Sequence, residues 1–243
     1  MKKLFSFFSL LLLLPFLGSD GGAFYAQQAA TYGIAVQYAR PVEQFRDNGY
    51  RDGFGMSMNL LSRPRFTNPV VGIQYGAQFD IEGSGMSADP LIMPSPETGE
   101  LAEMEVKNTQ MGLHGIARVV TTDRLPVQLY ADGMIGSRLF MGQESFEHLD
   151  NSYECPEINT LQSDFVFSYG GSLGALIRLG AFGSLDLRTT YLSSAGSAEF
   201  IDLQSVAQTE AGIYGYRLER APASQLRFQL GFNMLLVGGC SRW

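Results

Sequence analysis

The feature that most constrains this chain is an alternation of apolar with small or polar residues, which returns in eight separate runs. The run Tyr32–Ala39 shows it clearly: the even positions are tyrosine, isoleucine, valine and tyrosine, and the odd positions are glycine, alanine, glutamine and alanine. Alternation with period two predicts a strand that has one apolar face. The runs are 32–39, 50–60, 71–82, 109–119, 127–141, 165–177, 183–193 and 226–234. They predict an all-β fold.

The lengths of the runs and of their connections favour a barrel that crosses a membrane. Most runs are longer than an ordinary strand of about 5–6 residues, and they match the roughly 9–11 residues that a tilted strand needs to cross a bilayer. The connections 83–108, 142–164 and 194–225 are long, whereas 61–70, 120–126 and 178–182 are short. Long loops at one end and short turns at the other are typical of outer-membrane barrels. An even strand count then places both termini in the periplasm.

Two eight-stranded architectures fit this alternation. A lipocalin-type barrel is apolar inside, and an outer-membrane barrel is apolar outside. Glycine falls mainly on the polar face, as a narrow interior requires. That face also carries Arg and carboxylates of both signs, which pair well when confined. We therefore expect a lumen charge network of Asp80, Asp132, Asp186, Arg118, Arg138, Arg188 and Arg227, with Asp132, Arg138, Asp186 and Arg188 in one network. We expect Ile34, Val36, Met56, Ile73, Leu187, Leu230 and Phe232 to face lipid.

The first 26 residues have the layout of a secretory signal peptide. Lys2 and Lys3 precede an apolar run at 4–17, and small residues follow it. The run is shorter than the roughly 20 residues of a spanning helix, although a short N-terminal anchor is an alternative. Cleavage after Ala23 or after Ala26 fits the small-residue requirement. The barrel domain is then expected over residues 27–243.

With these features, the chain resembles the small outer-membrane β-barrel proteins of Gram-negative bacteria, of the OmpA/OmpX transmembrane type. The resemblance rests on the strand pattern over the mature chain and on no catalytic motif. It implies an eight-stranded antiparallel up-and-down transmembrane β-barrel with a narrow, filled lumen. It also implies outer-membrane lipids, lipopolysaccharide and the barrel assembly machinery as partners.

Composition and motifs give little support to catalysis or cofactor binding. The net charge is −7 and the chain has three lysines, so a nucleic-acid partner is not expected. Two histidines argue against a zinc site, and we expect no cofactor and no metal. His114 lies on the polar face, but the lipid A deacylase places a serine two residues after its histidine, where this chain has Ile116. A hydrogen-bonded lumen histidine is the simpler interpretation.

The long connections are acidic and the short ones carry arginines. Residues 83–106 contain five carboxylates and no Lys or Arg. Residues 142–164 contain six carboxylates and likewise no Lys or Arg. Such loops either keep the surface soluble or meet divalent cations or basic partners. The leading hypothesis is a non-enzymatic outer-membrane protein with a structural, surface-interaction or envelope-integrity role. The alternative is an outer-membrane transporter or channel for small hydrophobic molecules. Because the topology puts Cys155 and Cys240 on opposite sides of the bilayer, we expect no disulfide between them.

Overall fold

The computed structural model describes residues 30–236 except 63, 67–69, 87–90, 95–100, 122–124, 149–156, 180–182 and 209–213. The expected signal peptide (residues 1–26), both cysteines and the side chain of His148 lie outside the described residues.

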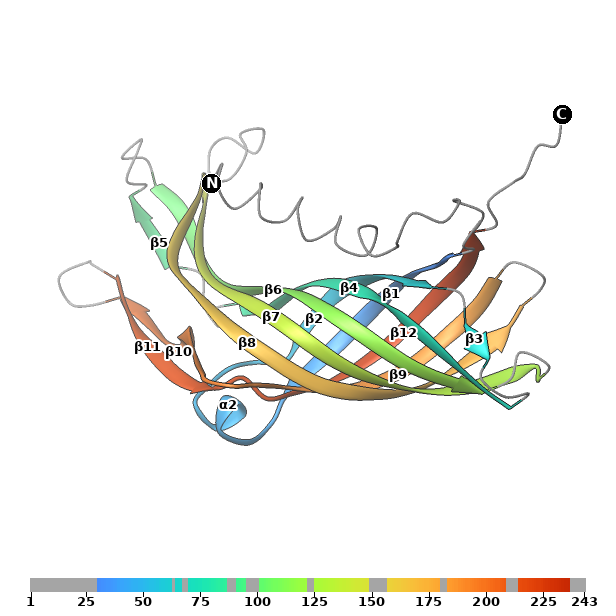
Figure 1. Ribbon diagram of the computed structural model, residues 1–243. Coiled ribbons are helices and arrows are strands. Elements are labelled where there is room, and N and C mark those ends of the chain that lie inside the picture. Colours follow the sequence, from blue (N-terminus) through green and yellow to red (C-terminus); the bar gives the residue numbers. More distant parts are fainter. Residues whose placement is uncertain are drawn as a thin grey trace, which may run out of the picture.

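Eight antiparallel strands close into a barrel (Figure 1). Each is hydrogen-bonded to the next, and β1 pairs with β2 on one edge and with β12 on the other, so the sheet has no open seam. The predicted all-β, eight-stranded antiparallel barrel is thus confirmed. The strands in barrel order are β1 (Ala30–Pro41), β2 (Gly53–Ser62), β4 (Val71–Met86), β6 (Leu101–Thr121), β7 (Val127–His148), β8 (Glu157–Arg178), β9 (Gly183–Ser194) and β12 (Gln225–Leu236).

The long connections are not simple loops, which corrects the interpretation of 83–108, 142–164 and 194–225. Strands β6, β7 and β8 continue well beyond their predicted ends. Residues 194–225 form a hairpin of β10 (Ser197–Gln208) and β11 (Tyr214–Pro222), which pair only with each other. The helix α2 (Glu43–Asp47) contacts β11, and two short strands complete the set, β3 (Arg65–Phe66) and β5 (Leu91–Pro94). We call α2, the hairpin and the extensions of β6–β8 the head. It lies at one end of the barrel, at the left of Figure 1.

On the barrel wall, charged side chains point inward and apolar side chains point outward, which is the reverse of the arrangement in a water-soluble barrel. Arg118, Arg138 and Arg227 point inward and are at most 1% exposed. Outward-facing Leu173 and Ile135 are 70% and 59% exposed. This distribution excludes the lipocalin-type alternative, in which apolar side chains fill the interior.

Glycine keeps the interior narrow at specific contacts. In one row across the sheet, Gly136 lies between His114 on β6 and Ser168 on β8. A Cβ atom at Gly136 would lie 2.0 Å from the carbonyl oxygen of Leu113. The glycine therefore allows the two flanking side chains to meet across β7.

Candidate functional sites of the barrel

One polar cluster lies in the lumen half away from the head, beside the buried apolar side chains of Val120 and Leu176. Arg118 on β6 makes a bidentate contact with Asp132 on β7, at 2.7 and 2.9 Å, and both are buried. The Ser172 hydroxyl donates to the second Asp132 oxygen at 2.8 Å. The Arg118 guanidinium also lies 3.7 Å from the centroid of the Tyr130 ring. Paired charges and a cation–π contact together offset the desolvation of this arginine.

A second buried pair joins the same cluster through Tyr130. Arg188 Nη2 contacts Asp186 at 2.7 Å, both on β9. Arg188 Nε donates to the Tyr130 hydroxyl at 2.8 Å, and that hydroxyl donates to Asp186. The Gln78 side chain accepts a hydrogen bond from Arg188, and the Asn233 side chain donates one to Asp186. Asp132, Asp186 and Arg188 thus lie around one tyrosine.

Another cluster lies toward the head. Arg227 on β12 contacts Asp80 at 2.9 Å and Glu82 at 3.4 Å. Arg138 donates to the Gln225 side chain at 2.8 Å and to the carbonyl oxygen of Ala223. Gln225 in turn donates to Glu82 at 3.0 Å. All of these charged side chains are buried.

The seven expected lumen residues therefore form two clusters instead of one. Asp132 and Arg138 lie on the same face of β7, but six residues separate them, about 20 Å along a strand. Arg138 is in register with Gly112 and Val166, near the head, and its partners come from the end of the hairpin and the start of β12. The expectation that Arg138 shares a network with Asp132, Asp186 and Arg188 is wrong for this reason.

Sequence reasoning missed Tyr130, Gln78 and Gln225, which connect the charges. For Tyr130, the sequence did contain a signal. This residue occupies an inward position of its run, where a large aromatic side chain is unexpected unless its hydroxyl has a polar partner. For Gln225, the sequence contained no such signal, because this residue lies just before the last alternating run and its contacts depend on how the hairpin is placed.

His114 makes a chain of contacts that has the residue types of a hydrolase triad. Its Nε2 lies 2.7 Å from Ser168 Oγ, and its Nδ1 lies 3.4 Å from Asp80 Oδ1. All three residues are fully buried. Asp80 is also paired with Arg227, and the Ser168 side chain has no exposed surface through which a substrate could reach it. A nucleophile needs a space in which the reacting atom can sit, so we assign these contacts to hydrogen bonding within the lumen.

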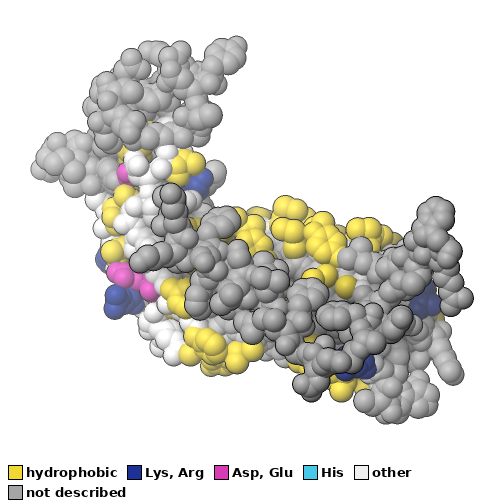
Figure 2. Space-filling model, turned by 45° about the horizontal axis from the view of Figure 1, so that its top comes forward, with side chains coloured by type: hydrophobic (Ala, Val, Ile, Leu, Met, Phe, Trp, Pro, Cys, Tyr) yellow, Lys and Arg dark blue, Asp and Glu magenta, His cyan; other side chains and the backbone are white. Residues whose placement is uncertain are grey.

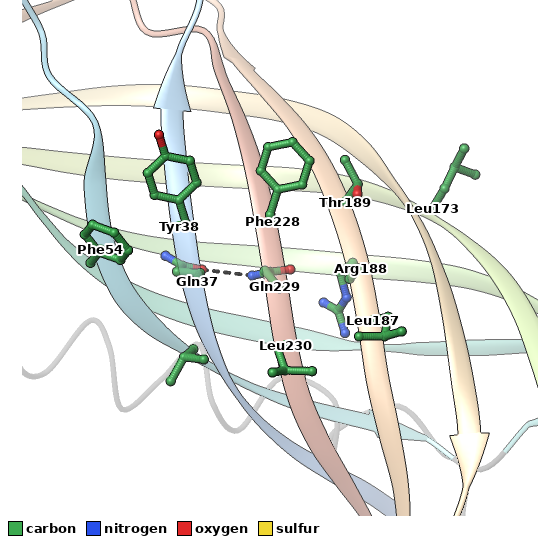
Figure 3. A pocket seen from close by; sticks show the side chains of 11 residues that line it. Gln37, Tyr38, Phe54, Leu173, Leu187, Arg188, Thr189, Phe228, Gln229 and Leu230 are labelled. Carbon is green, nitrogen blue, oxygen red and sulfur yellow. Dashed lines mark hydrogen bonds between the residues drawn. The ribbon is translucent and has the colours of Figure 1, made fainter.

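The outer wall forms an apolar belt. The seven residues expected to face lipid all point outward, and Val36, Leu230 and Met56 are about half exposed. Figure 2 shows hydrophobic side chains gathered along the barrel, with Asp and Glu at the end that carries the head. One pocket of 470 Å³ lies on this wall, over β2, β1, β12, β9 and β8 (Figure 3).

The head has an apolar core of its own. Phe45 of α2 stacks on Tyr50 with ring centroids 4.0 Å apart, and both rings meet Phe140 and Phe200 edge-on. Burial raises the pKa of the Tyr50 phenol. A second cluster is formed by Met104, Val106, Phe146, Ile201 and Leu203. Inward positions of β6 and β7, which are mostly polar within the barrel, are therefore apolar here, where the hairpin covers them.

Other kinds of site are absent from the described part of the chain. None of its helices is long and apolar enough to cross a membrane. No group of three or more His, Cys, Asp or Glu in these same residues is arranged to hold a metal ion.

Comparisons with known proteins identify no family for this chain. Neither the protein-family models nor the curated proteins contain a match. Among solved structures, the chain is similar to neisserial surface protein A (12% identity, TM-score 0.41, covering 86% of this chain and 97% of that one). It is similar to Ail, the attachment invasion locus protein of Yersinia pestis (13% identity, TM-score 0.42, covering 86% of this chain and 99% of that one). It is also similar to a major outer membrane protein from Thermus thermophilus (14% identity, TM-score 0.42, covering 85% of this chain and 98% of that one).

Proposed function

We propose that the chain is an integral outer-membrane barrel with a structural, surface-interaction or envelope-integrity role, and that its head lies outside the cell. The observation that carries the proposal is a change of side-chain character along β6. Toward the barrel, outward Met111 and Leu113 are apolar. Toward the head, outward Lys107, Glu105 and Glu103 are polar, while inward Met104 and Val106 become apolar. Such an exchange is expected where a strand leaves hydrocarbon and enters water.

The polar lumen supports a structural role over transport. A transporter for small hydrophobic molecules needs a continuous apolar cavity that opens to lipid. The described lumen side chains are buried and mostly charged or polar, and the apolar ones form two separate clusters, Leu61, Ile116, Met134 and Leu192, and Val120, Tyr130 and Leu176. Strands β1 and β12 pair over twelve residues, so this seam gives no lateral opening. We propose no catalysis, because His114, Ser168 and Asp80 are fully buried.

The proposed orientation follows from the strand ends. Ala30 at the start of β1 pairs with Leu236 at the end of β12, at the end of the barrel opposite the head. With the head outside, both termini are periplasmic, residues 1–26 are the export signal, and assembly takes place through the barrel assembly machinery. Lipopolysaccharide is then the lipid around the head-side half of the belt, and the acidic surface meets divalent cations or basic partners.

The test combines fractionation with site-directed labelling in cells. The protein should sediment with outer membranes and migrate faster on an unheated gel than after boiling. In a background in which Cys155 and Cys240 are serine, Ser145→Cys in the head should react with a membrane-impermeant maleimide on intact cells. Leu125→Cys, exposed near the other end of the barrel, should react only after the outer membrane is permeabilised. The reverse labelling pattern would overturn the orientation, and absence from the outer-membrane fraction would overturn the proposal.

A further inference from the structure

The connection between β1 and β2, residues 42–52, crosses the head-side mouth of the barrel, and we call it the strap. It contains α2, which lies at the head end in Figure 1. In the barrel order, β7 is four strands away from β1 in either direction. Phe45 of the strap nevertheless meets the inward ring of Phe140 on β7, with ring centroids 5.9 Å apart, and Tyr50 meets the same ring at 6.1 Å. The strap therefore reaches from one wall of the mouth to the opposite wall.

The rings of the strap complete an aromatic layer that covers the head-side charges of the lumen. Phe45, Tyr50, Phe140 and Phe200 contact one another and are each at most 2% exposed. The charges begin directly beneath this layer, because the Arg138 guanidinium lies 5.4 Å from the centroid of the Phe140 ring. The layer thus separates the head-side cluster from the surroundings of the head.

The strap is held in place by few contacts. Within it only the two aromatic side chains are buried. Its amide at Val42 donates to the Ser224 carbonyl oxygen at 3.0 Å, and Asn48 Nδ2 donates to the Arg220 carbonyl oxygen at 3.1 Å. A segment with so few buried contacts opens locally at a much lower free-energy cost than a strand that is paired on both edges.

Two residues in the left-handed backbone region flank α2. Glu43 has a φ of 55° and Gly49 a φ of 90°, and Glu43 is the one non-glycine residue with positive φ in the described part of the chain. Its carboxylate accepts a long hydrogen bond from Tyr191, at 3.5 Å. The left-handed region strains a residue that carries a Cβ, and strained residues of this kind gather at switch segments. The strain at Glu43 is relieved when the strap leaves the mouth, so it favours opening.

We propose that the strap is a gate, which swings out of the mouth about Glu43 and Gly49 and gives small water-soluble molecules access to the head-side charges. The inference goes beyond the proposed function and does not depend on which side of the membrane the head occupies. In the closed position, Gln44, Arg46 and Asp47 face away from the lumen and are exposed. Opening allows water to solvate the buried charges beneath the rings, which offsets part of the cost of exposing the two rings.

The experiment measures how fast a cysteine beneath the strap is modified in the purified full-length barrel. Ser57→Cys, in the background in which the native cysteines are serine, lies level with Asp80 at a position that is 1% exposed. A small, charged methanethiosulfonate is added to the protein in detergent, and the adduct is followed by mass spectrometry. The cysteine should react slowly, at the rate at which the strap opens. Phe45→Ala should raise this rate about tenfold or more, because it removes one of the two buried anchors. Glu43→Gly should lower the rate several-fold, because glycine adopts a positive φ without strain.

Two matched substitutions serve as controls. Phe146→Ala removes a ring from the other apolar cluster of the head and should leave the rate unchanged. Asp47→Gly places a glycine inside α2, where φ is not positive, and should not lower the rate. The gel-mobility shift of each variant shows that the barrel is folded.

A second reporter position tests the route of entry. Ser172→Cys lies in the cluster away from the head and should stay unmodified when Phe45 is replaced by alanine. A hole left by the missing ring would speed the reaction in Phe45→Ala, but it would not slow the reaction in Glu43→Gly. An unchanged rate in Glu43→Gly, no acceleration in Phe45→Ala, equal acceleration by the ring control, or equally fast modification at Ser172→Cys would each overturn the gate.

Discussion

The side-chain amide of Asn108 pairs with the backbone of Ile201, and this contact joins the barrel to the hairpin of the head. Asn108 Nδ2 donates to the Ile201 carbonyl oxygen at 2.7 Å, and the Ile201 amide donates to Asn108 Oδ1 at 3.2 Å. Both residues are buried. A similar contact lies beside it, where the Glu199 amide donates to Asp164 at 2.8 Å and its carbonyl accepts from Gln162 at 2.9 Å. Side chains of β6 and β8 thus replace a neighbouring strand along the edge of β10.

We expect Asn108→Ala to loosen the head without unfolding the barrel. The substitution leaves a buried amide and a buried carbonyl of Ile201 without partners, at a cost of about 1–3 kcal/mol for each unsatisfied group. Amide hydrogen exchange in β10 should accelerate, while exchange in β1 and β12 stays as in the wild type.

Thr109→Ala is the control for this prediction. Thr109 is the neighbouring, outward residue and donates one hydrogen bond to Gln143 at 3.2 Å. Its removal should leave exchange in β10 nearly unchanged. If Asn108→Ala also left it unchanged, the docking of the hairpin would depend on its apolar core alone.

The contact of Arg118 with Asp132 should show the behaviour of a buried ion pair. Asp132→Leu leaves a buried guanidinium uncompensated and should lower the free energy of unfolding by about 3–5 kcal/mol. The double variant Arg118→Met, Asp132→Leu removes both charges and should recover most of that loss. Urea unfolding, followed by the gel-mobility shift of the folded barrel, measures both. Equal destabilisation by the single and the double variant would contradict the pairing.

The strands and their faces were accessible from the sequence because period two is a local property. Each of the eight runs lies within an observed strand or overlaps it closely, and inward residues such as Asp80 were recognisable by polarity alone. The strands of the head were not predicted, because their pattern of apolar and polar residues is the reverse of the pattern in the barrel. Past Asn108 on β6, apolar Val106 and Met104 point inward while acidic neighbours point outward, and a run rich in carboxylates was interpreted as a loop.

The partners of the lumen residues could not be predicted, because they depend on the stagger between strands. His114 meets Ser168 across an intervening strand, and this requires β6, β7 and β8 to place both residues level with Gly136. Alternation predicts which face a residue occupies but not its height in the barrel. The assignment of Arg138 to the wrong cluster has the same origin.

An arginine introduced into the belt should destabilise the barrel according to its depth. Ile34→Arg, Ile73→Arg and Leu230→Arg should each cost about 2–4 kcal/mol if these positions lie near the middle of the bilayer. Ser145→Arg, on the outward face of the head, should cost much less, because that position is in water. Urea unfolding in lipid vesicles is the measurement.

Accessibility labelling provides an independent check of the belt. Cysteines placed at Ile34, Ile73 and Leu230, in the background without native cysteines, should react slowly with a water-soluble maleimide in intact membranes. Rapid reaction at these positions, at the rate seen for Ser145→Cys, would show that the outer wall faces water and would reverse the proposed arrangement.

Finally, we expect Ser168 to be unreactive in the folded protein despite its contact with His114. A serine nucleophile is activated when a histidine accepts its proton and an acid orients that histidine, but attack also needs access to a substrate. Here the three residues are fully buried, and Asp80 is shared with Arg227. A fluorophosphonate reagent should therefore add no mass to the folded barrel, and Ser168→Ala and His114→Ala should leave lipid A unmodified to the same extent as the wild type. Labelling that is lost in Ser168→Ala would instead show that a substrate-sized molecule reaches the lumen, and the barrel would then have to be treated as a hydrolase.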